Sequence, residues 1–260
     1  MTHPPGADPH DPSPAPARAD GDAMTGMPSD IRLEALAEGA WLWRFGDTID
    51  ATVNARVHEA AARLRAHLPH VECVPAYASL LLRVDLAEWE AHGGPLTAER
   101  LRAAIEAAWR KDASTNVVAR EVTVPVWYAG MDLADIAAHA RLSTDEVIAR
   151  HSAPTYRVAM LGFAPGFPYL LGLDPALAMP RRSQPRISVP AGSIAIGGLQ
   201  TGIYPQALPG GWHVLGRTPL RLFDLDADPP SRLLPGDHVR FQPIDEDTYR
   251  QFAAEAGVTP

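Results

Sequence analysis

The chain has 260 residues, of which 46% are hydrophobic, and its formal net charge is −8. This length and apolar content suit one large globular domain or two modest ones. The acidic balance, without any basic run, argues against nucleic-acid binding, and no apolar stretch is long enough to span a membrane.

Cysteine and lysine usage limits the chemistry. Cys73 is the only cysteine, so no disulfide can form within the chain. The first residues lack a basic-then-apolar signal pattern, and we expect a cytoplasmic protein. Lys111 is the only lysine, and it belongs neither to a phosphate-binding Gly-rich loop nor to a biotin-acceptor site flanked by methionines. We therefore expect no covalent biotin on this chain, and any ATP chemistry must use arginine, backbone N–H groups or a partner.

Residues 1–29 contain seven prolines among Ala, Asp and Gly and show no apolar periodicity. This composition predicts a disordered Pro-rich extension, with a docking tail as the alternative. Met24 or Met27 is a candidate for the true start of the chain.

Residues 30–117 are predicted to form a small α+β domain. Two strand-like runs, 31–36 and 40–45, flank Glu38-Gly39 and predict a hairpin. Apolar residues recur at helical spacing from Ile49 to Leu68, a strand is predicted at 77–84, and Thr97 can cap a second helix. The expected order is strand, strand, helix, strand, helix.

The second domain, residues 118–260, begins with Val122, Val124 and Val126, which alternate with polar or proline positions and predict a half-buried strand. Two short helices follow, the second opening with a capping box from Ser143 to Glu146. The pair lacks the basic residues that a helix-turn-helix needs for phosphate contacts, so DNA reading is disfavoured. His151 lies in the last turn, where an imidazole can act as acid or base or can interact with the helix dipole.

From residue 156 onward, short apolar runs alternate with Gly and Pro, which predicts a closed, mainly β barrel. A final helix is expected at about 245–256. The strand-like runs are 156–161, 187–189, 193–196, 213–215, 220–223 and 238–241.

The segment from Gly162 to Gly236 holds eleven of the twenty glycines. Glycine allows the backbone to approach a ligand closely. Between residues 162 and 217 the only acid is Asp174, and clustered arginine with Gly-rich backbone is typical of a carboxylate or phosphate site. Pairing with distant acids is the alternative for each one. The four arginines are Arg181, Arg182, Arg186 and Arg217.

Polar side chains in the same segment are candidates for substrate contacts. Gln200, Thr201 and Tyr204 offer donors and acceptors for a small amide or carboxylate, and Phe163 can line a pocket. Ser193 is not in a nucleophile elbow, and no zinc-binding histidine spacing occurs. We expect no metal bound by protein ligands alone.

An ordered string of motifs resembles the PxpB/KipI family, also called allophanate hydrolase subunit 1 or carboxyltransferase subdomain 1. The likeness spans about residues 31–245. Its motifs are Phe45-Gly46-Asp47, Val74-Pro75-Ala76-Tyr77, Gly162-Phe163-Ala164-Pro165-Gly166-Phe167-Pro168-Tyr169-Leu170, Pro180-Arg181-Arg182, Val189-Pro190-Ala191-Gly192-Ser193, Gln200-Thr201-Gly202-Ile203-Tyr204-Pro205, Pro209-Gly210-Gly211-Trp212 and Leu215-Gly216-Arg217-Thr218.

The resemblance implies a cyclophilin-like barrel behind a small α+β domain, and one component of an ATP-dependent 5-oxoprolinase that converts 5-oxo-L-proline to L-glutamate. Its partners would be a PxpC-like subunit, of the subdomain 2 type, and a PxpA-like subunit, with ATP and Mg²⁺ as co-substrate. Fused relatives imply a carboxyltransferase half of a urea-carboxylase system, and KipI implies a histidine kinase inhibitor.

On the hydrolase reading, four residues are expected to be catalytic. Arg182, Arg186 and Arg217 would stabilise oxyanion and phosphate charge. His151 would act as acid or base, since the His-Ser pair after its helix matches the family pattern. The three polar residues and Phe163 would hold the substrate. No complete catalytic set is visible, so we expect the isolated chain to be inactive.

Overall fold

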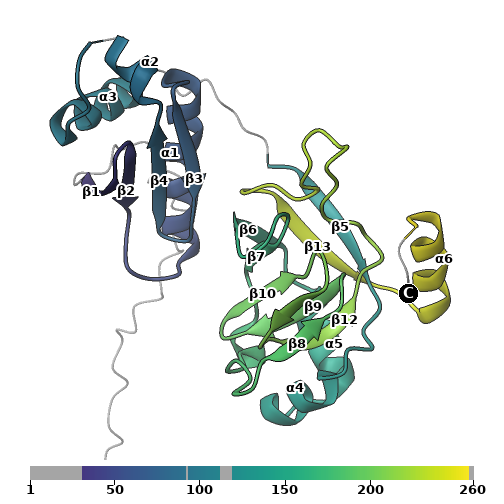
Figure 1. The fold of residues 1–260 in the computed structure, drawn as a ribbon. Coiled ribbons are helices and arrows are strands. Elements are labelled where there is room, and N and C mark those ends of the chain that lie inside the picture. The colour runs from purple at the N-terminus through teal and green to yellow at the C-terminus, as the bar shows by residue number, and fades with distance from the viewer. Residues whose placement is uncertain (1–30, 92, 112–118, 258–260) are drawn as a thin grey trace, which may run out of the picture.

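The computed structural model describes residues 31–91, 93–111 and 119–257. The expected Pro-rich extension, 1–29, lies outside these residues, and the expected boundary at 117/118 falls within an undescribed segment, so both stay predictions. Figure 1 shows an α+β lobe, purple to dark teal, followed by a mainly β lobe, teal to yellow. None of the described helices combines the length and the apolarity needed to cross a bilayer.

The first lobe is an antiparallel sheet of four strands in the order β1-β2-β4-β3, covered by helices. The predicted hairpin is confirmed, with Gly39 at φ +71° in its turn. A strand at 71–75 and a short helix at 86–91 were not expected. The elements are β1 (Arg32–Ala37), β2 (Ala40–Arg44), α1 (Ala51–His67), β3 (Val71–Pro75), β4 (Ser79–Val84), α2 (Leu86–Ala91) and α3 (Ala98–Arg110).

Local capping and burial explain the two longer helices of this lobe. The Asp50 side chain accepts from the N–H groups of Thr52 and Val53 at the start of α1, and Thr97 caps α3 as expected. Caps of this kind satisfy backbone donors that a helix cannot pair internally. The buried faces of α1 and α3 join one core with the sheet, which includes Trp43, Leu64 and Ile105.

The second lobe is built on a seven-stranded sheet in the order β12-β9-β10-β7-β6-β13-β5, with a separate two-stranded ribbon of β8 and β11. The elements are β5 (Glu121–Val126), α4 (Leu133–Ala140), α5 (Thr144–Ser152), β6 (Tyr156–Leu161), β7 (Pro168–Leu171), η1 (Pro175–Leu177), β8 (Arg186–Val189), β9 (Ser193–Gly197), β10 (Gln200–Ile203), β11 (Leu208–Gly210), β12 (His213–Arg217), β13 (His238–Pro243) and α6 (Glu246–Glu255).

The sheet curls so that its two edge strands meet. Trp127, directly after β5, forms an antiparallel bridge with Arg217 at the end of β12, with N–H···O distances of 2.9 Å in both directions. Gly130 then runs so close to β12 that an added Cβ would overlap backbone atoms of Val214 and Leu215. Glycine at this position therefore permits the closure of the barrel.

Most expected elements of this lobe are present. The capping box of α5 has both of its hydrogen bonds, and α6 begins one residue after its cap, Asp245. The strand expected at 220–223 is wrong, because only Phe223 forms a bridge, to Ser231, before the chain turns. The expectation of an α+β lobe followed by a barrel-like β lobe is confirmed.

Helix α1 links the two lobes through polar groups. Asn54, fully buried, donates to the carbonyl oxygens of Ala76, Tyr77 and Ala159 at 3.1–3.2 Å. His58 Nε2 donates to the same Ala159 oxygen at 2.9 Å. Ala159 belongs to β6, so the first lobe docks directly on the barrel.

Candidate functional site

The arginines of the Gly-rich segment separate into distinct environments. Arg186 donates to both carboxylate oxygens of Asp132, at 2.8 and 2.6 Å, and Arg182 donates to the same carboxylate at 3.3 Å. The Asp132 side chain is 2% exposed, and it also accepts from the Val214 N–H at 2.7 Å. One buried carboxylate therefore ties residues 182–186 to the barrel wall.

Charge and hydrogen bonding keep Asp132 ionised. Burial alone raises the pKa of this carboxyl, but the hydrogen bonds from Arg186 and the Val214 N–H, with the charges of both arginines, hold the pKa below its usual value. The carboxylate neutralises one of the two guanidinium groups, so Arg182 and Arg186 together retain about one positive charge.

Arg181 differs from its neighbour. Within the part of the chain that the structure describes, it makes no ion pair, and its guanidinium lies 5.7 Å from the ring centre of Trp212. It lines a cavity of about 290 Å³ together with Arg182, Phe163 and Tyr204. A guanidinium over an aromatic ring keeps its charge available to an anion while the ring orients it.

The walls of this cavity are mostly aromatic, and one of the aromatic side chains packs against a glycine. Phe167 packs edge-on against Phe163, Tyr204 and Trp212, with ring centres 5.2–5.8 Å apart. Gly210 lies against the Tyr204 hydroxyl, where an added Cβ would overlap it. Phe163 itself is 61% exposed and adopts φ +68°, so it stands at the rim. Phe163 and Tyr204, both expected at a substrate site, are thus brought together with two arginines.

Gln200 does not line the aromatic cavity. It lines a second cavity of about 510 Å³, to which Arg181 and Ile49 also contribute. Arg181 therefore lines both cavities. They form the candidate functional site.

His151 and Thr201 lie in the barrel interior. His151 is fully buried, donates through Nε2 to the Thr201 hydroxyl at 3.1 Å, and accepts at Nδ1 from Tyr128 at 2.8 Å. Thr201 in turn donates to the Ala195 carbonyl, which fixes this direction. Burial lowers the pKa of His151 to about 3, so the ring is neutral near pH 7. As placed, neither residue can contact a substrate, and the acid–base role of His151 stays a prediction that this geometry disfavours.

Arg217 lies at the barrel closure, apart from the other three arginines. It donates to the Ala191 carbonyl at 3.3 Å, and its guanidinium lies 5.9 Å from the ring centre of Tyr249 on α6. Its surroundings fit a residue that holds α6 and the closing strands together. The structure therefore does not bring Arg217 to the cavities.

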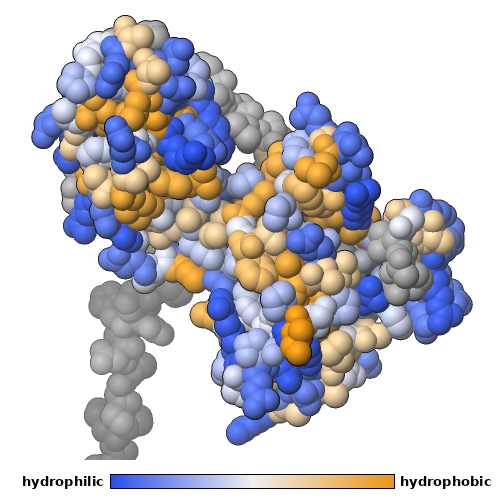
Figure 2. All heavy atoms as spheres, viewed as in Figure 1, coloured by the Kyte–Doolittle hydropathy of each residue, from blue (hydrophilic) through white to orange (hydrophobic). Residues whose placement is uncertain are grey.

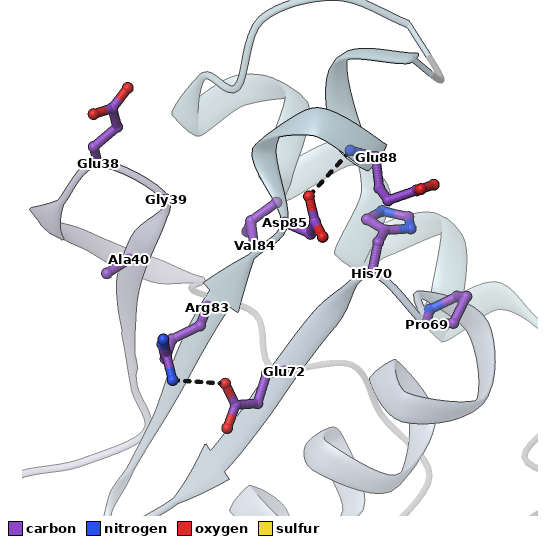
Figure 3. Close-up of a pocket in the computed structure, with 10 residues that line it drawn as sticks. All are labelled: Glu38, Gly39, Ala40, Pro69, His70, Glu72, Arg83, Val84, Asp85 and Glu88. Atoms are coloured by element: carbon purple, nitrogen blue, oxygen red, sulfur yellow. Dashed lines mark hydrogen bonds and ion pairs between the residues drawn. The ribbon is translucent and has the colours of Figure 1, made fainter.

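Another cavity, of about 820 Å³, lies on the α+β lobe. Figure 3 shows the arginine of this cavity, Arg83, paired with Glu72, and the Asp85 carboxylate accepting from the Glu88 N–H. Acidic groups dominate its rim and the one guanidinium is neutralised. This depression is unsuited to an acidic substrate, and no expected site residue lies there.

Two residues important for this site were not assigned a role from the sequence. Asp132 precedes the arginines by some fifty positions, and a local charge balance does not include it. Its position just before a predicted helix was the available signal. Arg181 was counted with the cluster, but nothing in the sequence distinguishes it from Arg182.

Comparisons with known proteins give consistent results. A model of the carboxyltransferase domain, subdomain C and D, matches residues 31–233. The chain is 41% identical over 234 residues to the B subunit of 5-oxoprolinase from Bacillus subtilis (strain 168), covering 86% of this chain and 98% of that relative. TTHA0988 superposes with a TM-score of 0.68 and 38% identity over 79% of this chain, which spans 40% of that structure's length. The Kluyveromyces lactis urea amidolyase superposes at 0.63 with 20% identity over 84% of this chain and 15% of its own, which shows a shared fold alone.

Proposed function

Since this chain belongs to the family of carboxyltransferase domains, subdomains C and D, we propose that it acts as the B subunit of an ATP-dependent 5-oxoprolinase. The match to the Bacillus subtilis protein carries this proposal, because the 41% identity extends over 98% of that relative. The likeness is therefore not confined to a module shared among unrelated enzymes. By the same inference the barrel has cyclophilin-like topology.

The proposed reaction is hydrolysis of the ring amide of 5-oxo-L-proline to L-glutamate. An unstrained amide is a stable bond, and ATP supplies a phosphoryl group that turns the amide oxygen into a leaving group. Water adds to the activated carbon, the ring C–N bond breaks and the nitrogen takes up a proton, which leaves an acyl phosphate. A second water displaces inorganic phosphate from it, so that glutamate, ADP and phosphate are the products. We place this chemistry in a complex with PxpC-like and PxpA-like subunits, in which the isolated chain has no turnover.

The described residues do not fit magnesium-bound triphosphate on their own. They contain no group of three or more His, Cys, Asp or Glu side chains able to hold a metal. Lys111 is the only lysine in the sequence, and Arg182 and Arg186 are already engaged by Asp132. We infer that the nucleotide and Mg²⁺ bind chiefly on a partner protein of the complex.

This chain would then supply the substrate side of the site. Arg181, which has no ion-pair partner among the described residues, lines both cavities, and Gln200 lines one of them. Phe163 and Tyr204 border the aromatic cavity, which Arg181 also lines. Arg182 lies close enough to share in anion binding while Asp132 holds it in place.

Reconstitution of the complex tests the proposal. The chain is co-purified with its subdomain 2 homologue and a PxpA-like subunit, and glutamate release from 5-oxo-L-proline is followed with and without MgATP. We expect turnover only with all subunits and ATP. Turnover by this chain alone would contradict its role as one part of a site, and an inactive complete complex would contradict the proposed reaction.

A further inference from the structure

The 510 Å³ cavity lies where the two lobes meet. Ile49, in the segment before α1, forms part of its wall, and strand ends and loops of the barrel form the rest. Figure 2 shows apolar surface, in orange, on the barrel face beside the α+β lobe. Most of the lining is aliphatic or glycine, and its polar side chains are Arg181 and Gln200. A mostly apolar cavity with few convergent polar groups is typical of a small-molecule site.

Arg181 and Gln200 offer different chemistry. Arg181 makes no ion pair with any described residue, so its charge is free to meet a carboxylate. Gln200 is 9% exposed and carries a primary amide, with a donor and an acceptor side by side. An amide inside a five-membered ring is held cis, so its N–H and C=O also point to the same side. The two amides can therefore pair through two hydrogen bonds.

Tyr77 extends this arrangement to the α+β lobe. Its carbonyl accepts from Asn54 at 3.2 Å, and its ring packs edge-on against Tyr169 at 6.0 Å. Its hydroxyl lies beside Gln200, is buried, and has no hydrogen-bond partner of good geometry among the described residues. Burial raises the pKa of Tyr77, so this group remains a neutral hydroxyl. The first lobe thus places a polar group next to Gln200.

We propose that the cavity between the lobes is the recognition site for a five-membered cyclic amide that bears a carboxylate. Arg181 pairs with the carboxylate, Gln200 pairs with the ring N–H and C=O, and Tyr77 is a positioning residue that orients Gln200. The inference rests on the proposed function and narrows it to these side chains. It also gives the α+β lobe a part in substrate binding.

Three ligands separate the two contacts: 5-oxo-L-proline has both groups, cyclopentanecarboxylate lacks the amide, and 2-pyrrolidinone lacks the carboxylate. Binding to the full-length chain, and to the reconstituted complex, is measured by ligand-observed saturation-transfer NMR, which detects weak binding. The variants are Arg181→Met, Gln200→Met and Tyr77→Phe. Arg240→Met is the matched control, since Arg240 is an exposed arginine on β13, paired with Glu121. Thermal unfolding verifies that each variant folds, and Gln200→Leu replaces Gln200→Met if the latter does not fold.

We expect a crossed pattern. Arg181→Met should weaken 5-oxo-L-proline and cyclopentanecarboxylate at least tenfold and leave 2-pyrrolidinone unchanged. Gln200→Met should weaken 5-oxo-L-proline and 2-pyrrolidinone and leave cyclopentanecarboxylate unchanged. Tyr77→Phe should follow the Gln200 pattern with a smaller effect. The proposal is overturned if Arg181→Met behaves like the control, if both variants affect all three ligands equally, or if neither the chain nor the complex binds 5-oxo-L-proline.

Kinetics of the complex separate this inference from the proposed function. In an active complex, Arg181→Met should raise KM for 5-oxo-L-proline about tenfold, with a smaller change in kcat. Normal turnover with an unchanged KM would leave the proposed function standing and remove this site. An inactive complex that still shows the crossed binding pattern would support this binding site and contradict the proposed function.

Discussion

Arg181 and Arg182 are adjacent and carry the same charge, yet Asp132 engages only the second. A carboxylate held between two guanidinium groups fixes the loop, and it leaves the remaining arginine to face the cavities. The sequence predicted an anion site here because it concentrates arginine among glycines. It did not predict which arginine is free, because that depends on a carboxylate brought in from the start of α4 by the fold.

Replacing Asp132 by asparagine tests the loop anchor. The variant keeps an acceptor for the Val214 N–H but leaves two guanidinium groups unpaired. Breaking a buried pair costs about 3–5 kcal/mol, and because both arginines are partly exposed we expect a loss of about 2–3 kcal/mol. Urea unfolding at pH 7 measures it, with Asp226→Asn, an exposed loop residue, as the control. An equal effect of both substitutions would contradict the anchor.

The same variant has a defined pH dependence. The folded-state pKa of Asp132 lies below its unfolded value of about 3.9, so its stabilisation is complete above that value. It is lost as the pH falls through the lower folded-state pKa. The stability difference between the natural chain and Asp132→Asn should therefore be constant above about pH 5 and shrink below about pH 4. A difference that persists unchanged to pH 2 would show that ionisation of Asp132 is not its source.

His151 gives a second prediction from pH. Burial lowers its pKa to about 3 from 6.5, so between these values the unfolded chain binds a proton that the folded chain does not. Stability should rise with pH across this window by up to about 1.4 kcal/mol per unit from this group. His151→Gln should flatten the slope by that amount, while His139→Gln, at an exposed site on α4, should not. A pH profile of the activity of the complex that shifts in His151→Gln would support the acid–base role of His151.

At the scale of elements, the sequence predicted what depends on neighbours along the chain. Caps at Thr97 and Ser143, and the alternation of valines in β5, were sufficient to place their elements. The short strand β3 was missed because its Val-Glu-Cys-Val-Pro run follows α1 after only three residues and ends in proline. Strand order and the closure of the sheet depend on pairings between distant segments, which no local pattern encodes.

The closure itself can be tested at Gly130. An added methyl group there would overlap backbone atoms of β12. Backbone atoms cannot move aside as the end of a flexible side chain can. Gly130→Ala should therefore destabilise the chain by about 1–3 kcal/mol, the usual range for overpacking. Gly46→Ala is the control, because its Cβ would meet only Val53 at ordinary contact distance. Calorimetry measures the melting temperatures of both variants. Equal melting temperatures would contradict the close approach of Gly130 to β12.

At the scale of the whole molecule, Asn54 couples the lobes. Its amide spans the α+β lobe and β6 of the barrel, so Asn54→Ala removes donors to buried carbonyls on both sides. We expect a loss of about 1–3 kcal/mol and a more open arrangement of the lobes. Unfolding measurements and small-angle scattering report the two effects. Gln251→Ala, which removes an exposed amide on α6, should change neither.

The parallel pairing of β5 with β13 has a consequence for how the protein is made. Glu121 pairs with His238, and Val126 pairs with Pro243. The first barrel strand therefore cannot pair with β13 until more than a hundred further residues have been synthesised. At about 5–20 residues per second, the ribosome leaves β5 without that neighbour for roughly 5–25 s. The α+β lobe, whose strands all lie before residue 85, can fold during this interval. A nascent chain stalled before residue 238 should thus display a finished first lobe and an unassembled barrel, with the valines of β5 accessible to chaperones.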